Sequence, residues 1–96
     1  MITRLTILRD TPSPVDPAAL ALSALGWILS DEHRADRLLA LTGLTPDELR
    51  ASLGNRGTLG AVLDFLAAHE PDLVAAADAL GVSPQELAGA SRALAA

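Results

Sequence analysis

The sequence contains an internal repeat, because residues 22–49 can be laid over residues 60–87 without a gap. The offset is 38 residues throughout, which is the separation of Gly43 from Gly81. Self-similarity at a fixed spacing indicates repeated supersecondary units, and this chain contains two copies. The matched positions are Leu25, Trp27, Ile28, Glu32, Gly43, Leu44, Thr45, Pro46, Glu48 and Leu49, which fall on Leu63, Phe65, Leu66, Glu70, Gly81, Val82, Ser83, Pro84, Glu86 and Leu87. These residues build helices and cores, so the repeat predicts a fold and no chemistry.

The composition favours helices over strands. Of the 96 residues 50% are apolar, but they are mainly leucine and alanine, with one tryptophan, one phenylalanine and no tyrosine. Such usage is typical of helical proteins, and the length suits one domain with one core. The chain has no cysteine, so disulfides and thiolate metal sites are excluded and nothing requires an oxidising compartment.

Hydropathy and charge limit the cellular compartments and the classes of partner that we expect. The longest uncharged stretch, residues 17–30, is shorter than the about 18 residues that a membrane span needs. The N-terminus lacks the apolar core of a signal peptide, so we expect a cytoplasmic protein that does not enter a membrane. The net charge of −5 disfavours phosphate ligands, and the lack of lysine excludes Schiff-base and P-loop lysines.

Residues 1–15 read as an extended arm with a proline-containing spacer, and residues 16–96 as the helical domain. The spacer cannot be helical at Pro12 and Pro14. Disordered tails are usually poor in large aliphatic residues, yet the arm carries four. We expect it to pack on an apolar groove of its own domain or of a neighbouring copy, and a flexible tail is the alternative. The residues concerned are Ile2, Leu5, Ile7 and Leu8, with Arg4 and Arg9 expected to pair with the acidic body.

Capping signals place three helices in the first unit. Asp16 caps the first helix, whose apolar face is so broad that we expect this helix to be central. The second helix ends at Gly43 in a Schellman arrangement, and Thr45 and Glu48 begin the third with a capping box. The residues expected to face inward are Ala18, Ala21, Leu22, Leu25, Ile28 and Leu29, then Ala35, Leu38 and Leu39, then Leu49 and Leu53.

The second unit repeats these signals. Thr58 begins the fourth helix, Pro71 opens the fifth, Gly81 ends it, and Ser83 and Glu86 form a second capping box. The residues expected to face inward are Leu59, Val62, Leu63 and Leu66, then Leu73, Val74, Ala77 and Leu80, then Leu87, Ala90, Ser91 and Leu94.

Neither unit can bury its leucines alone. We therefore predict an all-α fold of six short helices in two pseudo-equivalent three-helix units, about 17–53 and 58–94, that share one core. Trp27 and Phe65 are expected in that core, near the contact between the units.

Three short sequence motifs occur together at a characteristic spacing. They are Trp27, then Leu-Leu-Ala-Leu-Thr-Gly-Leu-Thr-Pro-Asp-Glu-Leu-Arg at residues 38–50, then Val-Leu-Asp-Phe-Leu at residues 62–66. Because of these motifs, residues 16–87 resemble a family of short, helical alphaproteobacterial proteins that is known as a domain of unknown function. The resemblance implies a bacterial, cytoplasmic, helical protein. It provides no activity, substrate or catalytic residue to transfer.

Residues 80–87 allow a second interpretation. Together with Ala77, they resemble the turn and second helix of a helix-turn-helix, with Gly81 at the turn and Leu87 at the buried position. Such modules gain most of their affinity from several basic phosphate contacts, whereas this helix offers only Arg92. Nucleic-acid binding is therefore the alternative to a purely structural role.

Two acidic turns contain histidine, at residues 31–33 and 69–72, and histidine with carboxylates can bind zinc. Neither turn has a known ligand spacing, and acidic residues at a helix start stabilise its dipole. We therefore predict no metal and no cofactor. Asp64 is the one carboxylate for which burial would indicate a chemical role, although a solvent-facing position is the favoured interpretation.

These observations predict no catalytic, cofactor-binding or metal-binding residue. Elimination favours a non-catalytic helical domain that binds another protein or forms a homo-oligomer. Some positive support comes from the apolar content, which in so small a domain can leave an exposed apolar patch. The alternative is a helix-turn-helix nucleic-acid-binding protein, and a minor enzyme comes third.

Overall fold

The computed structural model describes residues 16–95, and this part of the chain consists of helices and their connections, without strands. This finding confirms the predicted all-helical class. The expected arm, residues 1–15, lies outside the described residues. The helices are α2 (Pro17–Leu29), α3 (Glu32–Thr42), α4 (Pro46–Ala51), α5 (Arg56–Ala67), α6 (Glu70–Leu80) and α7 (Pro84–Ala95).

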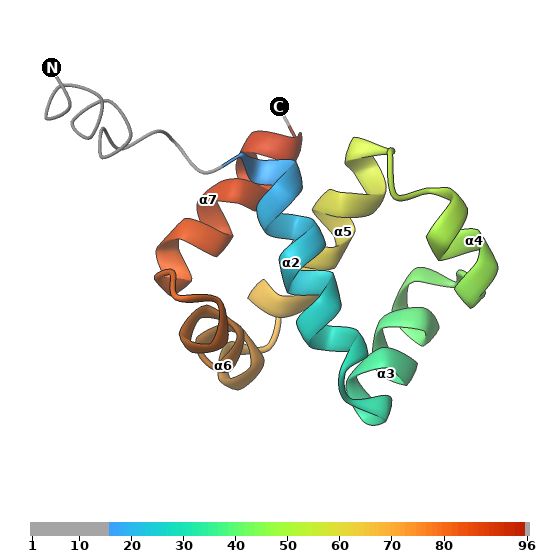
Figure 1. Cartoon of the computed structure of the whole chain (residues 1–96), viewed down its shortest axis with the longest axis horizontal. Coiled ribbons are helices and arrows are strands. Elements are labelled where there is room, and N and C mark those ends of the chain that lie inside the picture. The colour runs from blue at the N-terminus through green and yellow to red at the C-terminus, as the bar shows by residue number, and fades with distance from the viewer. Residues whose placement is uncertain (1–15, 96) are drawn as a thin grey trace, which may run out of the picture.

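Helix α2 is the central helix, as its broad apolar face predicted. It contacts α3, α5, α6 and α7, with α6 and α7 on one side of it and α3 and α4 on the other (Figure 1). Asp16 begins the helix by accepting a hydrogen bond from the Ala18 N–H at 3.3 Å. Ala21, Ala24 and Ile28 are fully buried. The small side chains allow neighbouring helices to approach α2 closely.

The core is formed mainly where α2, α5 and α7 meet, and α5 and α7 make the most extensive contact. Every residue predicted to face inward on α5 and α7 is buried, including Ser91. Fully burying an aliphatic side chain contributes roughly 1.5 to 3 kcal/mol. The largest fully buried side chains are those of Ile28, Leu38, Val62, Leu63, Leu66 and Leu87. This cluster holds α2, α5 and α7 together, and Leu38 adds α3 to it.

The two large aromatic residues behave differently from each other. Phe65 is buried, as predicted. Trp27 packs against the core but is only partly buried, because it lies at the edge where α3 begins. The Arg34 guanidinium stacks on the Trp27 ring, 3.7 Å from its centroid, and donates a hydrogen bond to the Trp27 carbonyl at 2.8 Å. A cation–π contact thus covers an aromatic ring that the core does not enclose.

The two helix-ending glycines adopt the left-handed conformation, with φ of 74° at Gly43 and 73° at Gly81. The predicted Schellman arrangement is wrong for Gly43 and is found at Gly81, where the Val82 N–H donates to the Ala77 carbonyl at 3.0 Å. At Gly43 the helix closes with a single bond to the Leu39 carbonyl. The reason is local, because the Leu44 N–H donates to the Thr42 hydroxyl instead.

Both predicted capping boxes are present. The Thr45 hydroxyl accepts from the Glu48 N–H at 3.1 Å, the Ser83 hydroxyl accepts from the Glu86 N–H at 3.1 Å, and each glutamate bonds back at 2.9 Å. The predicted start of α5 at Thr58 is wrong. Asn55 begins this helix earlier, because its side chain accepts from two backbone N–H groups at 2.7 and 3.3 Å.

Three residues predicted to face inward are exposed instead. The exposed fractions are 43% for Leu22, 46% for Leu29 and 51% for Val74. On α6 the buried positions belong to Ala76 and Ala77. The apolar faces of α2 and α6 are therefore wider than the neighbouring helices cover. On the α3 side of α2, the short helix α4 contributes to this, because it has six residues and makes little contact with the other described helices.

Replacing a capping hydroxyl should weaken the fold. Thr45→Ala and Ser83→Ala should each reduce the free energy of unfolding by about 1 kcal/mol, because a helix-start N–H loses its acceptor. Chemical denaturation measures the change. Ser23→Ala, at an exposed position of α2, is the control and should stay within about 0.5 kcal/mol of the wild type. Unchanged stability in both cap variants would contradict the assignment.

Candidate interaction surface

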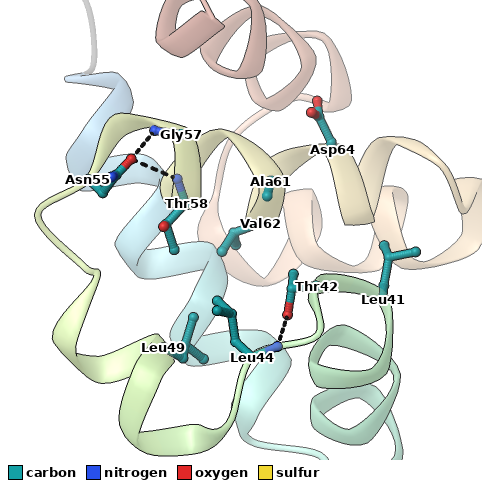
Figure 2. A pocket seen from close by; sticks show the side chains of 10 residues that line it. All are labelled: Leu41, Thr42, Leu44, Leu49, Asn55, Gly57, Thr58, Ala61, Val62 and Asp64. Atoms are coloured by element: carbon teal, nitrogen blue, oxygen red, sulfur yellow. Dashed lines mark hydrogen bonds between the residues drawn. The ribbon is translucent and has the colours of Figure 1, made fainter.

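A cleft of about 430 Å³ lies between the end of α3, helix α4 and the N-terminal part of α5. Figure 2 shows Leu44, Leu49 and Val62 in its middle, with Leu41 and Asp64 toward one end and Asn55 at the other. Leu49 and Val62 are buried and Leu44 is partly buried. The remaining residues that line the cleft are Thr42, Gly57, Thr58 and Ala61. Its interior is therefore mainly apolar.

Three local signals in the sequence build the walls of this cleft. The left-handed Gly43 ends α3 and reverses the chain. The Thr45 capping box then begins α4, which ends after six residues at Ala51. Asn55 caps the following helix. With only six residues, α4 covers little of the neighbouring surface of α3 and α5, and the cleft stays open between them.

Two of the polar side chains along the cleft, those of Thr42 and Asn55, have backbone partners. The Thr42 hydroxyl donates to the Leu38 carbonyl at 3.0 Å and accepts from the Leu44 N–H at 3.3 Å. The Asn55 side-chain oxygen accepts from the N–H groups that begin α5 (Figure 2). These groups hold the walls in place. The other lining residues are apolar or glycine, apart from Thr58 and Asp64.

The rim of the cleft carries one apolar and one acidic side chain. Leu41 is 67% exposed and is the most exposed large apolar residue among residues 16–95. Asp64 is exposed, so the favoured interpretation of a solvent-facing carboxylate is confirmed. The buried Ser91 hydroxyl donates a hydrogen bond to Asp64. Asp64 therefore joins α5 to α7 and is not an isolated buried acid.

The acidic turn that begins α6 has a structural role. The Asp72 side chain is 15% exposed and accepts a hydrogen bond from Arg37 Nη2 at 2.7 Å, with His69 Nδ1 at 3.1 Å. Burial alone raises the pKa of the Asp72 carboxyl, but Arg37 and His69 outweigh burial and hold that pKa below its ordinary value. This ion pair ties α3 to α6.

The other acidic turn that contains histidine, at residues 31–33, is built differently. The Asp31 carboxylate accepts from the Arg34 N–H at 3.0 Å and caps α3, while His33 is exposed. Within residues 16–95 no group of three histidine, aspartate or glutamate side chains is arranged to hold a metal ion. The two turns thus act as helix starts in the structure.

Four of the five arginines in the described part of the chain are engaged inside the molecule. Arg34 stacks on Trp27, Arg37 pairs with Asp72, and the other two are on α4 and α5. Arg50 pairs with Asp47 at 3.1 Å, and Arg56 donates to the Ala93 carbonyl at 2.8 Å. Phosphate groups of a nucleic acid would have to compete with these internal partners.

Comparison with known proteins gives a family for the chain. A family model described as "Protein of unknown function (DUF3572)" matches residues 15–96. The chain belongs to the DUF3572 family. The match agrees with the resemblance seen in the sequence phrases and covers all six helices of this DUF3572 member. Neither the curated proteins nor the solved structures include a match.

Sequence reasoning named no residue of the cleft as a site residue. It assigned Leu49 and Val62 to the core, which is correct, and it considered Asp64 only as a carboxylate that burial would make interesting. The available signal was the short distance between Pro46, which opens α4, and Gly54 in the next turn. That distance limits α4 to a helix too short to cover its neighbours. None of the helices between residues 16 and 95 has the length and apolar character to cross a lipid bilayer.

Removing the charge of Asp72 should change stability and its dependence on pH. Asp72→Asn should lower the free energy of unfolding at pH 7 by about 1 kcal/mol, because the ion pair with Arg37 is partly exposed. A carboxyl whose pKa is depressed in the folded state adds stability above its unfolded pKa. That stability is lost as the pH falls through the folded pKa. The wild type should therefore weaken more than the variant below about pH 4.

Denaturation curves at a series of pH values between 7 and 3 test this expectation. Asp36→Asn, at an exposed position of α3, is the matched control and should keep the pH dependence of the wild type. Parallel pH profiles for the wild type and Asp72→Asn would show that the carboxylate contributes nothing to folding.

Proposed function

We propose that this protein is a non-catalytic interaction module of the cytoplasm that binds a protein partner, or a second copy of itself, through the cleft between α3, α4 and α5. The observation that carries the proposal is the exposure of Leu41, 67%, at the rim of an apolar cleft. A partner that covers a large exposed apolar side chain next to a cleft gains binding free energy from its burial. The cysteine-free sequence fits a reducing compartment.

The polar groups support a binding role more than a catalytic one. Catalysis needs side chains that are free to contact a substrate and exchange protons with it. At this cleft, Thr42 and Asn55 serve the backbone, and Asp64 accepts from Ser91. Chemistry by these three side chains would require their structural hydrogen bonds to break. Binding of an apolar segment in the cleft would leave these hydrogen bonds intact.

We also propose that segments 17–53 and 58–94 are pseudo-equivalent units. Helices α3 and α6 keep the offset of 38 residues at both ends, and their final glycines share the left-handed conformation. In this relation α4, with six residues, is the shorter counterpart of α7, with twelve. Helix α7 packs on α2, α5 and α6, whereas α4 makes little contact. The shortening of α4 explains why an apolar cleft is open beside it.

The nucleic-acid alternative has less support. Residues 16–95 contain five arginines and eleven carboxylates, and Arg92 is exposed on α7. The Glu86 carboxylate at the start of α7 accepts from the Ser83 N–H. An acidic, capped helix start repels the DNA backbone, where such modules usually present basic residues.

Replacing Leu41 should remove partner binding and leave the fold intact. Immobilised full-length wild type should capture its partner from native cytoplasm at least about ten times better than Leu41→Ser, since burying a leucine contributes about 1.4 kcal/mol or more. Val74→Ser is the matched control, because Val74 is 51% exposed on α6. Quantitative mass spectrometry of the captured proteins measures the ratio, and light scattering reports a homo-oligomer.

Two results would contradict the role of the cleft. One is equal capture by the wild type and Leu41→Ser, and the other is an equal loss of binding in Val74→Ser. A salt-dependent shift of DNA in a gel would instead favour the nucleic-acid alternative.

A further inference from the structure

Helix α2 carries an apolar stripe that the other described helices leave partly open. Leu22 and Leu29 are 43% and 46% exposed, although each is a large aliphatic residue. Residues spaced by three and four positions lie on one face of a helix. With Ala18 and the buried Leu25, these two leucines follow that spacing and form one continuous stripe.

The stripe leads into a second cleft, of about 260 Å³, on the other side of α4 from the first. Leu25 and Leu29 line it from α2, and Leu39 and Leu53 line it from the side of α3 and α4. Among the described residues that line this cleft, Arg50 is the only charged one. The cleft and the stripe together offer a path of apolar surface along the length of α2.

The segment that precedes α2 has the right attachment point and length to follow this path. Asp16 is the N-cap of α2, so the preceding chain leaves from the N-terminal end of the stripe. The thirteen residues of α2 span about 20 Å. An extended chain advances about 3.3 Å per residue, so about six residues cover the same distance. A chain that turns back at residue 15 would therefore bring Leu8 and Arg9 to the cleft.

The residues of this segment match the chemistry at each end of the path. Pro12 and Pro14 favour an extended backbone beside α2. The aliphatic residues of the arm are suited to a cleft lined by leucines. Arg9 would lie near the C-terminal end of α2, where the helix dipole is negative, beside Arg34, which already donates a hydrogen bond to the Trp27 carbonyl. The surplus of carboxylates in residues 16–95 adds to that attraction.

We propose that the segment Ile2–Leu8 docks in the cleft between α2, α3 and α4 of its own chain, with residues 10–15 lying along the exposed leucines of α2. The occupant would cover Leu22 and Leu29, which the helices leave open. The proposal does not depend on the interaction function above, because it concerns the cleft on the opposite side of α4.

Introduced cysteines provide a direct test, because the natural chain has none. A disulfide forms readily only when the two Cα atoms come within about 7 Å. Under mild oxidation of dilute full-length protein, Leu8→Cys combined with Leu29→Cys should form an intramolecular disulfide. Leu8→Cys combined with Val74→Cys is the matched control, since Val74 is exposed on α6. Non-reducing electrophoresis should show at least about tenfold faster closure in the Leu29 pair.

Two outcomes of this test overturn the proposal. Disulfide-linked dimers as the main product of the Leu29 pair would place the arm of a second copy in the cleft. Equal rates of closure in the two pairs would mean that the arm has no preferred place on the domain.

A thermodynamic cycle tests the same contact without cysteines. Deleting residues 1–10 should lower the Tm by roughly 4 to 8 °C and leave the oligomeric state the same as that of the full-length protein. In a Leu22→Ser and Leu29→Ser background the same deletion should have little effect, because the arm has already lost its surface. An unchanged Tm on deletion in the wild-type background would overturn the proposal. So would an equal loss of Tm in both backgrounds, because the arm would then act elsewhere.

Discussion

The packing of α5 and α7 against the small-residue face of α2 is the interaction on which the rest of the structure depends. Ala21 and Ala24 let the helices approach, and Leu63 and Leu87 are almost fully buried in the contact. The other described helices attach to this core by smaller contacts. Helix α3 is joined to α6 by the Arg37–Asp72 ion pair, and α4 is held mainly through Leu49. Stability is therefore concentrated in one part of the molecule and open surface in another, around α4.

The short helix α4 links the fold to the proposed functions. Leu49 lines both clefts, one on each side of α4. A helix of six residues has too few turns to cover two neighbours, whereas α7, with twelve residues, reaches α2, α5 and α6. Its length is set by local signals, the capping box at its start and the turn before Asn55. The capping box and the turn before Asn55 thus keep α4 short, and apolar surface beside α4 stays uncovered by the described helices.

Several features that sequence predicted correctly are decided locally, although local signals misled at Gly43 and at Thr58. A hydroxyl with a glutamate three residues later forms a capping box where a helix begins at the hydroxyl residue, and proline directly after Thr45 and Ser83 marked both as helix starts. Periodicity identified the buried faces of α5 and α7 but failed for Leu22, Leu29 and Val74. It reports which side of a helix is apolar and not how far neighbouring helices extend over it. The clefts could not be predicted for the same reason. Each depends on how three helices are spaced, which periodicity does not report.

The arginines show how the charge of the chain is distributed between fold and surface. Arg34 covers Trp27, and Arg37 lies 5.4 Å from the Phe65 ring centroid while it pairs with Asp72. These two guanidinium groups therefore interact with aromatic rings and a carboxylate of the domain itself. The exterior keeps a surplus of carboxylates, which slows the approach of acidic partners and of nucleic acids and speeds that of basic surfaces. A partner that combines an apolar segment with flanking basic residues therefore matches the apolar lining of the clefts and the net negative charge of residues 16–95, and Arg4 and Arg9 give the arm of the chain itself that combination.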